Sequence, residues 1–333
     1  MQTKLVKALF GGALVLALAG GAVAQESRLK SSAEMYDSFV EATKGRTIAW
    51  VPQATGMPLT DGWTQVMRQE AADLGMTLEM RDAAFSSTKM TQAVNALILE
   101  KPDVLVVHNF DVQLLARALR KAEEAGIYVV QLNMVSNYKT DAFVGGNWRE
   151  IARGMGEDIV ARCSRDQGKS GKVAHIQGDL TSDVSILESE GLKAAFEGHD
   201  GIEIVVDQAA QWDPNKAREI TASALQQHPD LCAIVGHWGP MTMGAGQAVK
   251  AAGKSDQVTI YSTGENPQFI CDAIKDGVLD RYWSVDNLKQ GRDVMLTIKY
   301  LLQMNQPPGT FRLAGYSPVE ILDKDNVERR CWK

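Results

Sequence analysis

The sequence predicts an α/β protein built from two doubly wound domains, each with a parallel β-sheet. The main observation is a pattern that occurs twice, at residues 101–133 and 228–264. Each copy has a Pro-Asp start, a short apolar run, a histidine, an amphipathic helix that closes at Ala-Gly, and a second apolar run. This order predicts a strand, a crossover helix and a parallel strand. A chain of 333 residues is also long for a single core, which favours two domains.

The apolar runs at 104–107 and 233–235 lack polar alternation, which is typical of strands buried on both faces of a sheet. His108 and His237 follow these runs, at the strand ends where open parallel sheets bind ligands. The two halves could therefore face one ligand from opposite sides. Alternatively, both histidines are ordinary strand-end residues.

Alternating elements around the two copies complete each domain. Helices are expected over 26–44, 63–74 with Gly75 as C-cap, 86–99, 147–163, 188–196, 214–227, 267–275 and 288–304, the last followed by Pro307-Pro308. Further strands are expected over 47–51, 77–80, 128–133, 172–177, 203–207, 281–285 and 316–322. Asn147 is expected to cap the helix that follows it.

The first residues predict export. Lys4 and Lys7 precede an apolar stretch at 8–19, which is too short to span a bilayer but suits a secretory signal. Ala22-Val23-Ala24 supplies a small-x-small cleavage site, so residues 1–24 are expected to be removed. No cysteine follows these small residues, so a bacterial lipid anchor is not expected. The alternative is an uncleaved membrane anchor.

Charge and cysteine content narrow the possible partners and the possible roles of the cysteines. A net charge of -6 with scattered basic residues argues against nucleic acid as a partner. Cys163, Cys232, Cys271 and Cys331 all lie in the exported part, where three disulfide connectivities are possible. Their spacing has no metal-site pattern. Buried free thiols are the alternative to disulfides.

Several stretches taken together resemble the periplasmic sugar-binding proteins of the ribose-binding type, which are the soluble receptors of ABC importers. They are TIAWVPQATGMP, KPDVLVVHN, AGIYVVQLN, FVGGN, GDLTSDVSILESEGLKAAF, AQWDPNKA, HPDLCAIVGHWGPMTMGAGQAVKAAG and PVEILDKDNV. No single motif is specific, but their order covers nearly all of the chain after the leader. The resemblance implies a type I periplasmic binding protein in the periplasm, a monomer without cofactor that delivers its ligand to a membrane permease.

The resemblance also implies a hinge of three strands between the domains. The crossings are expected near Gly145, Ser284 and Glu320. The first domain would comprise residues 25–145 plus 284–320, and the second 146–283 plus 321–333. In this fold Cys163 and Cys232 both lie at the end of the second domain away from the ligand, which favours that pair. The cleft between the domains would close on the ligand.

Carried over by position, the expected ligand-binding residues lie in loops that follow the strands or in a crossing. They are Gln53, Thr55, Met57, His108, Asn109, Asn133, Asp179, Ser185, Glu188, Trp212, His237, Trp238, Thr263 and Trp283. Amide and carboxylate groups match vicinal hydroxyls, and flat aromatic faces cover the C–H side of a carbohydrate. The alternatives are that each tryptophan packs on its own domain and that Glu188 faces solvent.

Departures from the ribose-type pattern concern the ligand. An Arg near Glu188, an Asn near Trp238 and an Asp near Thr263 are missing, and Asn133 stands where an Asp is usual. Ribose itself is therefore not expected. With few cationic groups at these positions, an anionic ligand is also disfavoured. The prediction is a neutral monosaccharide or sugar alcohol.

Other function classes find less support in the residues. The phosphate-loop spacing that ends at Lys169 and Ser170 fails because Cys163 stands where the first glycine is required. Neither a G-x-S-x-G nor an H-E-x-x-H motif occurs. An exported carbohydrate-active enzyme is a remote alternative. A transcriptional repressor would need a DNA-binding helix-turn-helix at its N-terminus, where the signal peptide is expected instead. A receptor that reports to a chemoreceptor or sensor kinase remains open.

Overall fold

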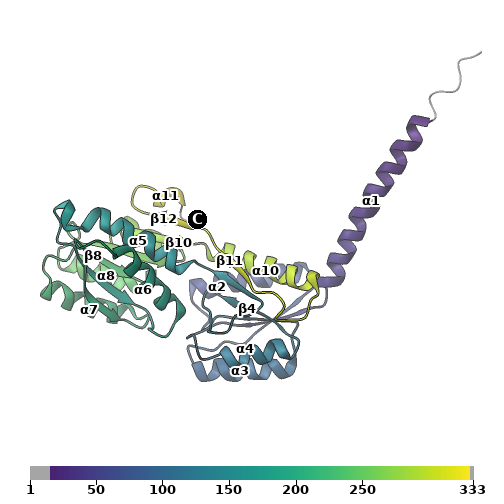
Figure 1. Cartoon of the computed structure of the whole chain (residues 1–333), viewed down its shortest axis with the longest axis horizontal. Coiled ribbons are helices and arrows are strands. Elements are labelled where there is room, and N and C mark those ends of the chain that lie inside the picture. The colour runs from purple at the N-terminus through teal and green to yellow at the C-terminus, as the bar shows by residue number, and fades with distance from the viewer. Residues whose placement is uncertain (1–15, 331–333) are drawn as a thin grey trace, which may run out of the picture.

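The computed structural model describes residues 16–330 and contains two six-stranded sheets, each covered by helices on both faces (Figure 1). The first sheet has the strand order β11-β5-β4-β3-β1-β2. Its strands are β1 (Thr47–Val51), β2 (Thr77–Met80), β3 (Val104–Val107), β4 (Tyr128–Leu132), β5 (Ala142–Gly145) and β11 (Leu313–Tyr316). Its helices are α2 (Pro58–Asp73), α3 (Ser87–Glu100), α4 (Ala116–Glu124) and α10 (Asn287–Met304). We call this unit the first domain.

The second domain repeats this arrangement with the strand order β12-β10-β9-β8-β6-β7. Its strands are β6 (Lys172–Gln177), β7 (Glu203–Ala209), β8 (Ala233–Gly236), β9 (Thr259–Gly264), β10 (Arg281–Val285) and β12 (Val319–Leu322). Its helices are α5 (Trp148–Cys163), the 3₁₀ turn η1 (Arg165–Gln167), α6 (Asp183–Phe196), α7 (Pro214–Gln227), α8 (Gly239–Ala251), α9 (Gln268–Lys275) and α11 (Val327–Arg330). The prediction of two doubly wound, parallel-sheet domains is thereby confirmed, with β12 as an antiparallel edge strand.

The β3 strand shows why short apolar runs form these sheets. All four of its residues are fully buried, and alternate side chains enter cores on opposite faces. Val104 and Val106 pack towards α2 and α10, whereas Leu105 and Val107 pack towards α3 and α4. A parallel strand covered on both faces has no polar side, which explains the missing alternation in the sequence.

The chain crosses between the domains three times. It leaves the first domain after β5, returns between β10 and α10, and leaves again between β11 and β12. The expected boundaries at Ser284 and Glu320 fall inside β10 and β12, which pair with each other in the second sheet. The crossings therefore follow Val285 and precede Val319.

Three expected elements differ in extent. The single strand expected over 316–322 is two strands in different sheets, because the chain changes sheets at Ser317 and at Pro318, which has no N–H for a ladder. The helix expected from residue 63 begins at Pro58, whose fixed φ suits the first helical position. The helix expected from residue 188 begins at Asp183, because Ser182 caps it by accepting a hydrogen bond from the Ser185 N–H.

The N-terminal helix α1 (Leu16–Thr43) projects away from both domains (Figure 1). It includes the predicted cleavage site and most of the helix expected over 26–44, and the start of the leader lies outside the described residues. Cleavage stays a prediction. Within residues 16–330, no helix combines the length and the apolar character that a membrane span requires.

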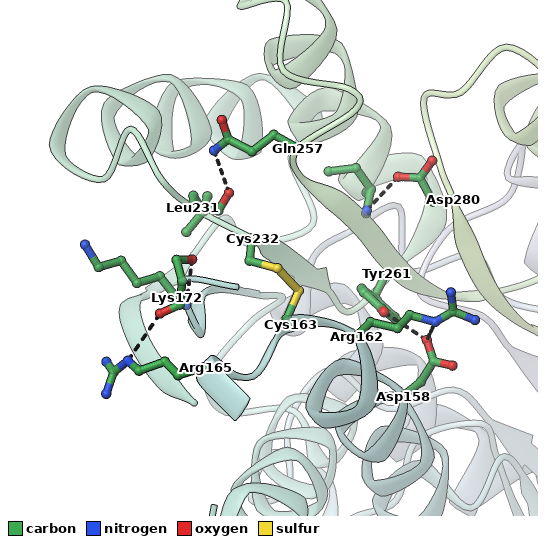
Figure 2. The surroundings of a disulfide bond; sticks show 12 residues. Asp158, Arg162, Cys163, Arg165, Lys172, Leu231, Cys232, Gln257, Tyr261 and Asp280 are labelled. Atoms are coloured by element: carbon green, nitrogen blue, oxygen red, sulfur yellow. Dashed lines mark hydrogen bonds and ion pairs between the residues drawn. A yellow bond between two sulfur atoms is a disulfide. The ribbon is translucent and has the colours of Figure 1, made fainter. Parts of the chain in front are cut away.

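A disulfide joins Cys163, at the end of α5, to Cys232, just before β8 (Figure 2). Both residues are buried in the core between the second sheet and α5 with α6. The bond lies at the amino end of β8, opposite the end at which His237 follows the strand. The predicted pairing is confirmed, whereas Cys331 lies outside the described residues.

Candidate functional site

A cavity of about 500 Å³ lies between the two domains and is lined by residues from both. Its walls come from the segments that follow β1, β3 and β4 in the first sheet and β7, β8 and β9 in the second. The carboxyl ends of the two parallel sheets therefore face the same space, as expected for this class of fold. Eight of the expected ligand-binding residues line it: Gln53, Met57, His108, Asn133, Trp212, His237, Trp238 and Thr263.

Two tryptophans of the second domain form an aromatic corner. The rings of Trp212 and Trp238 stand nearly perpendicular, at 82° with 6.5 Å between their centroids. The Trp212 ring lies against Gly178, where an added Cβ would be 2.1 Å from the indole. Gln211 and Trp212 both adopt left-handed backbone conformations, with φ of 55° and 62°. Two consecutive residues in this region are strained, which indicates that the loop is shaped to hold the indole where it is.

Glu265 adds a buried carboxyl group to this corner. The residue is fully buried, and its Oε2 accepts a hydrogen bond of 3.1 Å from the Trp238 indole. Its Oε1 has no partner among the described residues. Burial raises the pKa of Glu265, and neither lysine nor arginine is among the described residues that line the cavity. A group with these properties is available to a ligand.

The first domain contributes His108 and Asn133. His108 is buried against the edge of Trp63, and neither ring nitrogen has a partner among the described residues. Burial lowers the pKa of His108 to about 3, so the ring is neutral. Asn133 has a left-handed φ of 65° and a buried Oδ1 without a partner. Buried polar atoms are usually paired in proteins, so unpaired ones beside a cavity are groups that can bond to a ligand.

Gln53, also from the first domain, is committed to internal contacts. Its side-chain amide donates hydrogen bonds to the Asn109 carbonyl and, at 3.2 Å, to the Met134 sulfur. The amide therefore braces the loop after β3 against the loop after β4. Met134, like Gln53, lines the cavity.

A buried histidine pair supports the cavity wall at His237. The Gly178 N–H donates to Nδ1 of His237 at 3.3 Å, so the proton of the neutral ring lies on Nε2. That nitrogen is 2.7 Å from Nε2 of His175, whose Nδ1 in turn lies 3.0 Å from Oδ1 of Asp207. Burial and the neighbouring His175 lower the pKa of His237, and the hydrogen bond from His175 lowers the pKa of Asp207 to about 2. Both His237 nitrogens are thus occupied within the protein.

Glu188 and Thr263 lie beside this pair. The Thr263 hydroxyl donates to Glu188 Oε1 at 3.0 Å, and Oε2 of Glu188 is 3.7 Å from Nε2 of His237. Glu188 is buried, contrary to the solvent-facing alternative, and burial raises its pKa. Ser185 is also buried, with its hydroxyl 3.2 Å from Nδ1 of His237. Ser185 and Glu188 therefore lie behind the lining, where they orient His237 and Thr263.

The remaining expected residues do not line the cavity. Thr55 donates to Asp82 at an exposed position, and Asp179 accepts from Thr181 in the turn before α6. Asn109 is buried and donates to Gln131 at 2.7 Å. The Trp283 ring packs in the core between the second sheet and α5, 6.0 Å from the Tyr261 ring. Its expected position in a crossing is not observed, because β10 is a full strand of the second sheet.

The sequence did not single out several other lining residues. Trp148 lines the cavity from the start of α5 and donates from its indole to the Asn133 carbonyl at 3.0 Å. Asn147 caps this helix, as predicted. Phe85, 59% exposed in a left-handed conformation, lines it from the loop after β2. Glu265 directly follows the second repeat, and Trp148 directly follows the FVGGN stretch. Their residue types alone did not distinguish them from residues that pack within one domain.

Metal binding finds no support at this site. Within residues 16–330, no group of three or more His, Cys, Asp or Glu side chains is arranged to hold a metal ion. The chemistry of the lining is that of aromatic stacking and a few hydrogen bonds.

Comparisons with known proteins agree with this geometry. Residues 48–306 match the family model described as a periplasmic binding protein domain. A D-ribose/D-allose-binding protein of Pseudomonas aeruginosa is 30% identical over 205 residues, or 60% of this chain and 62% of that protein's length. A putative rhizopine-binding protein of Rhizobium meliloti is 26% identical over 76% of this chain and 82% of its own. These relatives are binding proteins.

Solved structures share the fold. An ABC transporter solute-binding protein of Mycobacterium smegmatis with bound glycerol has a TM-score of 0.75 and 24% identity, covering 87% of this chain and 98% of its own. One from Agrobacterium vitis, bound with α-D-tagatopyranose, has a TM-score of 0.75 and 20% identity, covering 86% and 99%. At these identities the likeness concerns the fold.

Proposed function

The chain belongs to the periplasmic binding protein domain family, and for this reason we propose that it is the substrate-binding protein of a sugar-type ABC transporter. In this proposal it binds a neutral monosaccharide or sugar alcohol between its domains, in the periplasm, and delivers it to a membrane permease. It acts as a monomer without catalytic turnover. Ribose, allose and rhizopine in the names of its relatives support a small hydroxylated ligand.

One observation carries the proposal. Three buried side chains that line the interdomain cavity, His108, Asn133 and Glu265, have polar atoms without a partner among the described residues. Two of them belong to the first domain and one to the second. A ligand that bonds to all three stabilises only the arrangement in which the domains are close together. Ligand binding therefore shifts the equilibrium towards closure.

The three crossings provide the hinge for this motion. Asp286 caps α10 directly after β10, accepting from the Lys289 N–H at 2.9 Å, and Ser317 lies between β11 and β12. The remaining crossing, the first along the chain, leads from β5 to Trp148. Because all three are short, a small change of dihedral angles there rotates one domain against the other. A closed form with bound ligand would present the outer surface that a permease recognises.

Thermal-shift screening against sugars, alditols and cyclitols tests the proposal. A ligand that binds the native state raises the melting temperature with its concentration. Trp212→Ala is expected to abolish the shift and leave the unliganded melt nearly unchanged, because Trp212 is only partly buried. Tyr300→Ala, an exposed aromatic on α10, serves as the control that retains the shift. An undiminished shift in Trp212→Ala would remove this residue from the site, and turnover of the ligand would contradict a pure binding role.

A further inference from the structure

The cavity that would hold the ligand is mainly apolar. Beside the three tryptophans, the lining includes Met57, Leu59, Phe85, Met134, Val184 and Val285, which come from both domains. Trp148 lines the space from the first turn of α5 and donates to the Asn133 carbonyl. Small-molecule sites are commonly apolar with a few placed polar groups, but a fully hydroxylated sugar demands partners over its whole surface.

Most polar side chains of the lining are already bonded within the protein. Both nitrogens of His237 are occupied, and the Thr263 hydroxyl bridges Glu188 and the His237 carbonyl. Asp213 accepts from two N–H groups at the start of α7. The Trp148 and Trp238 indoles donate to protein acceptors. These groups cannot turn towards a ligand without losing a partner.

Among the described residues that line the cavity, three side chains carry fully buried polar atoms without a partner: His108, Asn133 and Glu265. Their four unpaired atoms, two of them on His108, match a few polar groups of a ligand but not a ring that carries a hydroxyl on every carbon. Each further hydroxyl would be buried against methyl, thioether or aromatic groups, and an unpaired buried hydroxyl weakens binding. Contact with the apolar walls, in turn, favours a ligand that presents C–H or aryl surface.

We propose that the ligand is a neutral ring compound that lacks hydroxyl groups over much of its surface, such as a deoxy sugar, an aryl glycoside or an alicyclic diol. This inference rests on the proposed function, because it names the ligand class of the same cavity. Of two compounds that differ mainly in hydroxylation, the fully hydroxylated sugar or cyclitol is then expected to bind more weakly.

Isothermal titration of the wild-type protein with matched pairs tests this inference. The pairs are L-fucose with L-galactose, L-rhamnose with L-mannose, phenyl β-D-glucopyranoside with D-glucose, and trans-1,2-cyclohexanediol with myo-inositol. In pairs that bind, the less hydroxylated member is expected to bind at least about tenfold more tightly. Equal or tighter binding of the fully hydroxylated members overturns the inference and leaves the proposed function standing. Binding of neither member in any pair overturns both.

A second variant tests the wall itself. Val184→Thr keeps the side-chain size but places a hydroxyl in the lining, so the preference within a binding pair is expected to fall several-fold. Val205→Thr makes the same change on β7 at a partly buried position outside the lining, and it should keep the preference. An unchanged preference in Val184→Thr would contradict the assignment of this wall to the apolar surface of the ligand.

Discussion

Removing the disulfide between Cys163 and Cys232 should destabilise the second domain strongly. The two residues are separated by 69 positions, so the bond closes a long loop in the unfolded chain. Loop-closure entropy for this separation corresponds to about 4 kcal/mol at 25 °C, within the roughly 2–5 kcal/mol typical of native disulfides. For a domain of this size, we expect the melting temperature to fall by about 8–16 °C.

The double variant Cys163→Ala/Cys232→Ala is the suitable perturbation, because Cys271 is also disulfide-bonded and a reducing agent would act on its bond as well. Calorimetry of the variant and the parent measures the difference in melting temperature. Ligand affinity at temperatures where both are folded should be unchanged, because the bond lies at the end of β8 opposite the cavity. A loss below about 1 kcal/mol would refute the entropy argument.

Two further changes test the site and its surroundings. Gly178→Ala places a Cβ 2.1 Å from the Trp212 ring, so calorimetric titration should show that the ligand affinity falls at least about tenfold. Gly154→Ala is the control, because its added Cβ has its nearest contact at 3.6 Å, and it should bind the ligand normally. Equal affinity in the two variants would contradict this role of Gly178. Burial raises the pKa of Asp183 from 3.8 to about 7, so the folded state retains a proton that the unfolded state releases. Stability should therefore fall between these pH values by about 4 kcal/mol, and Asp183→Asn should remove this slope in urea titrations; an unaltered slope would contradict this origin.

Much of the fold could be predicted because local patterns and the final structure agree. The two repeated units both formed a strand, a helix and a parallel strand, and the apolar runs before His108 and His237 are buried strands. The start of α6 could not be predicted from residue types alone, because Ser and Asp are common both in loops and at helix starts, and the cap at Ser182 is defined by its hydrogen bond from the Ser185 N–H. The change of sheets at Ser317 depends on pairing with β10, which no local pattern reveals.

The candidate site was harder to predict, because position in a loop does not decide which way a side chain points. Trp238 and Trp283 both looked like ligand-stacking residues, yet one lines the cavity and the other is buried in the core. Glu265 was missed because burial, which sets its properties, depends on Trp238 and the surrounding strands. The tertiary environment, more than residue type, separates the residues of the lining from those behind it.

The supports of the aromatic corner determine whether it moves when the domains rotate. Trp212 rests on Gly178, and Trp238 is tethered to Glu265, so every brace belongs to the second domain. Rotation of the first domain leaves these supports intact. In the proposed function, a ligand therefore first contacts a fixed half of its site in the second domain. His108 and Asn133 of the first domain would then complete its contacts when the domains close.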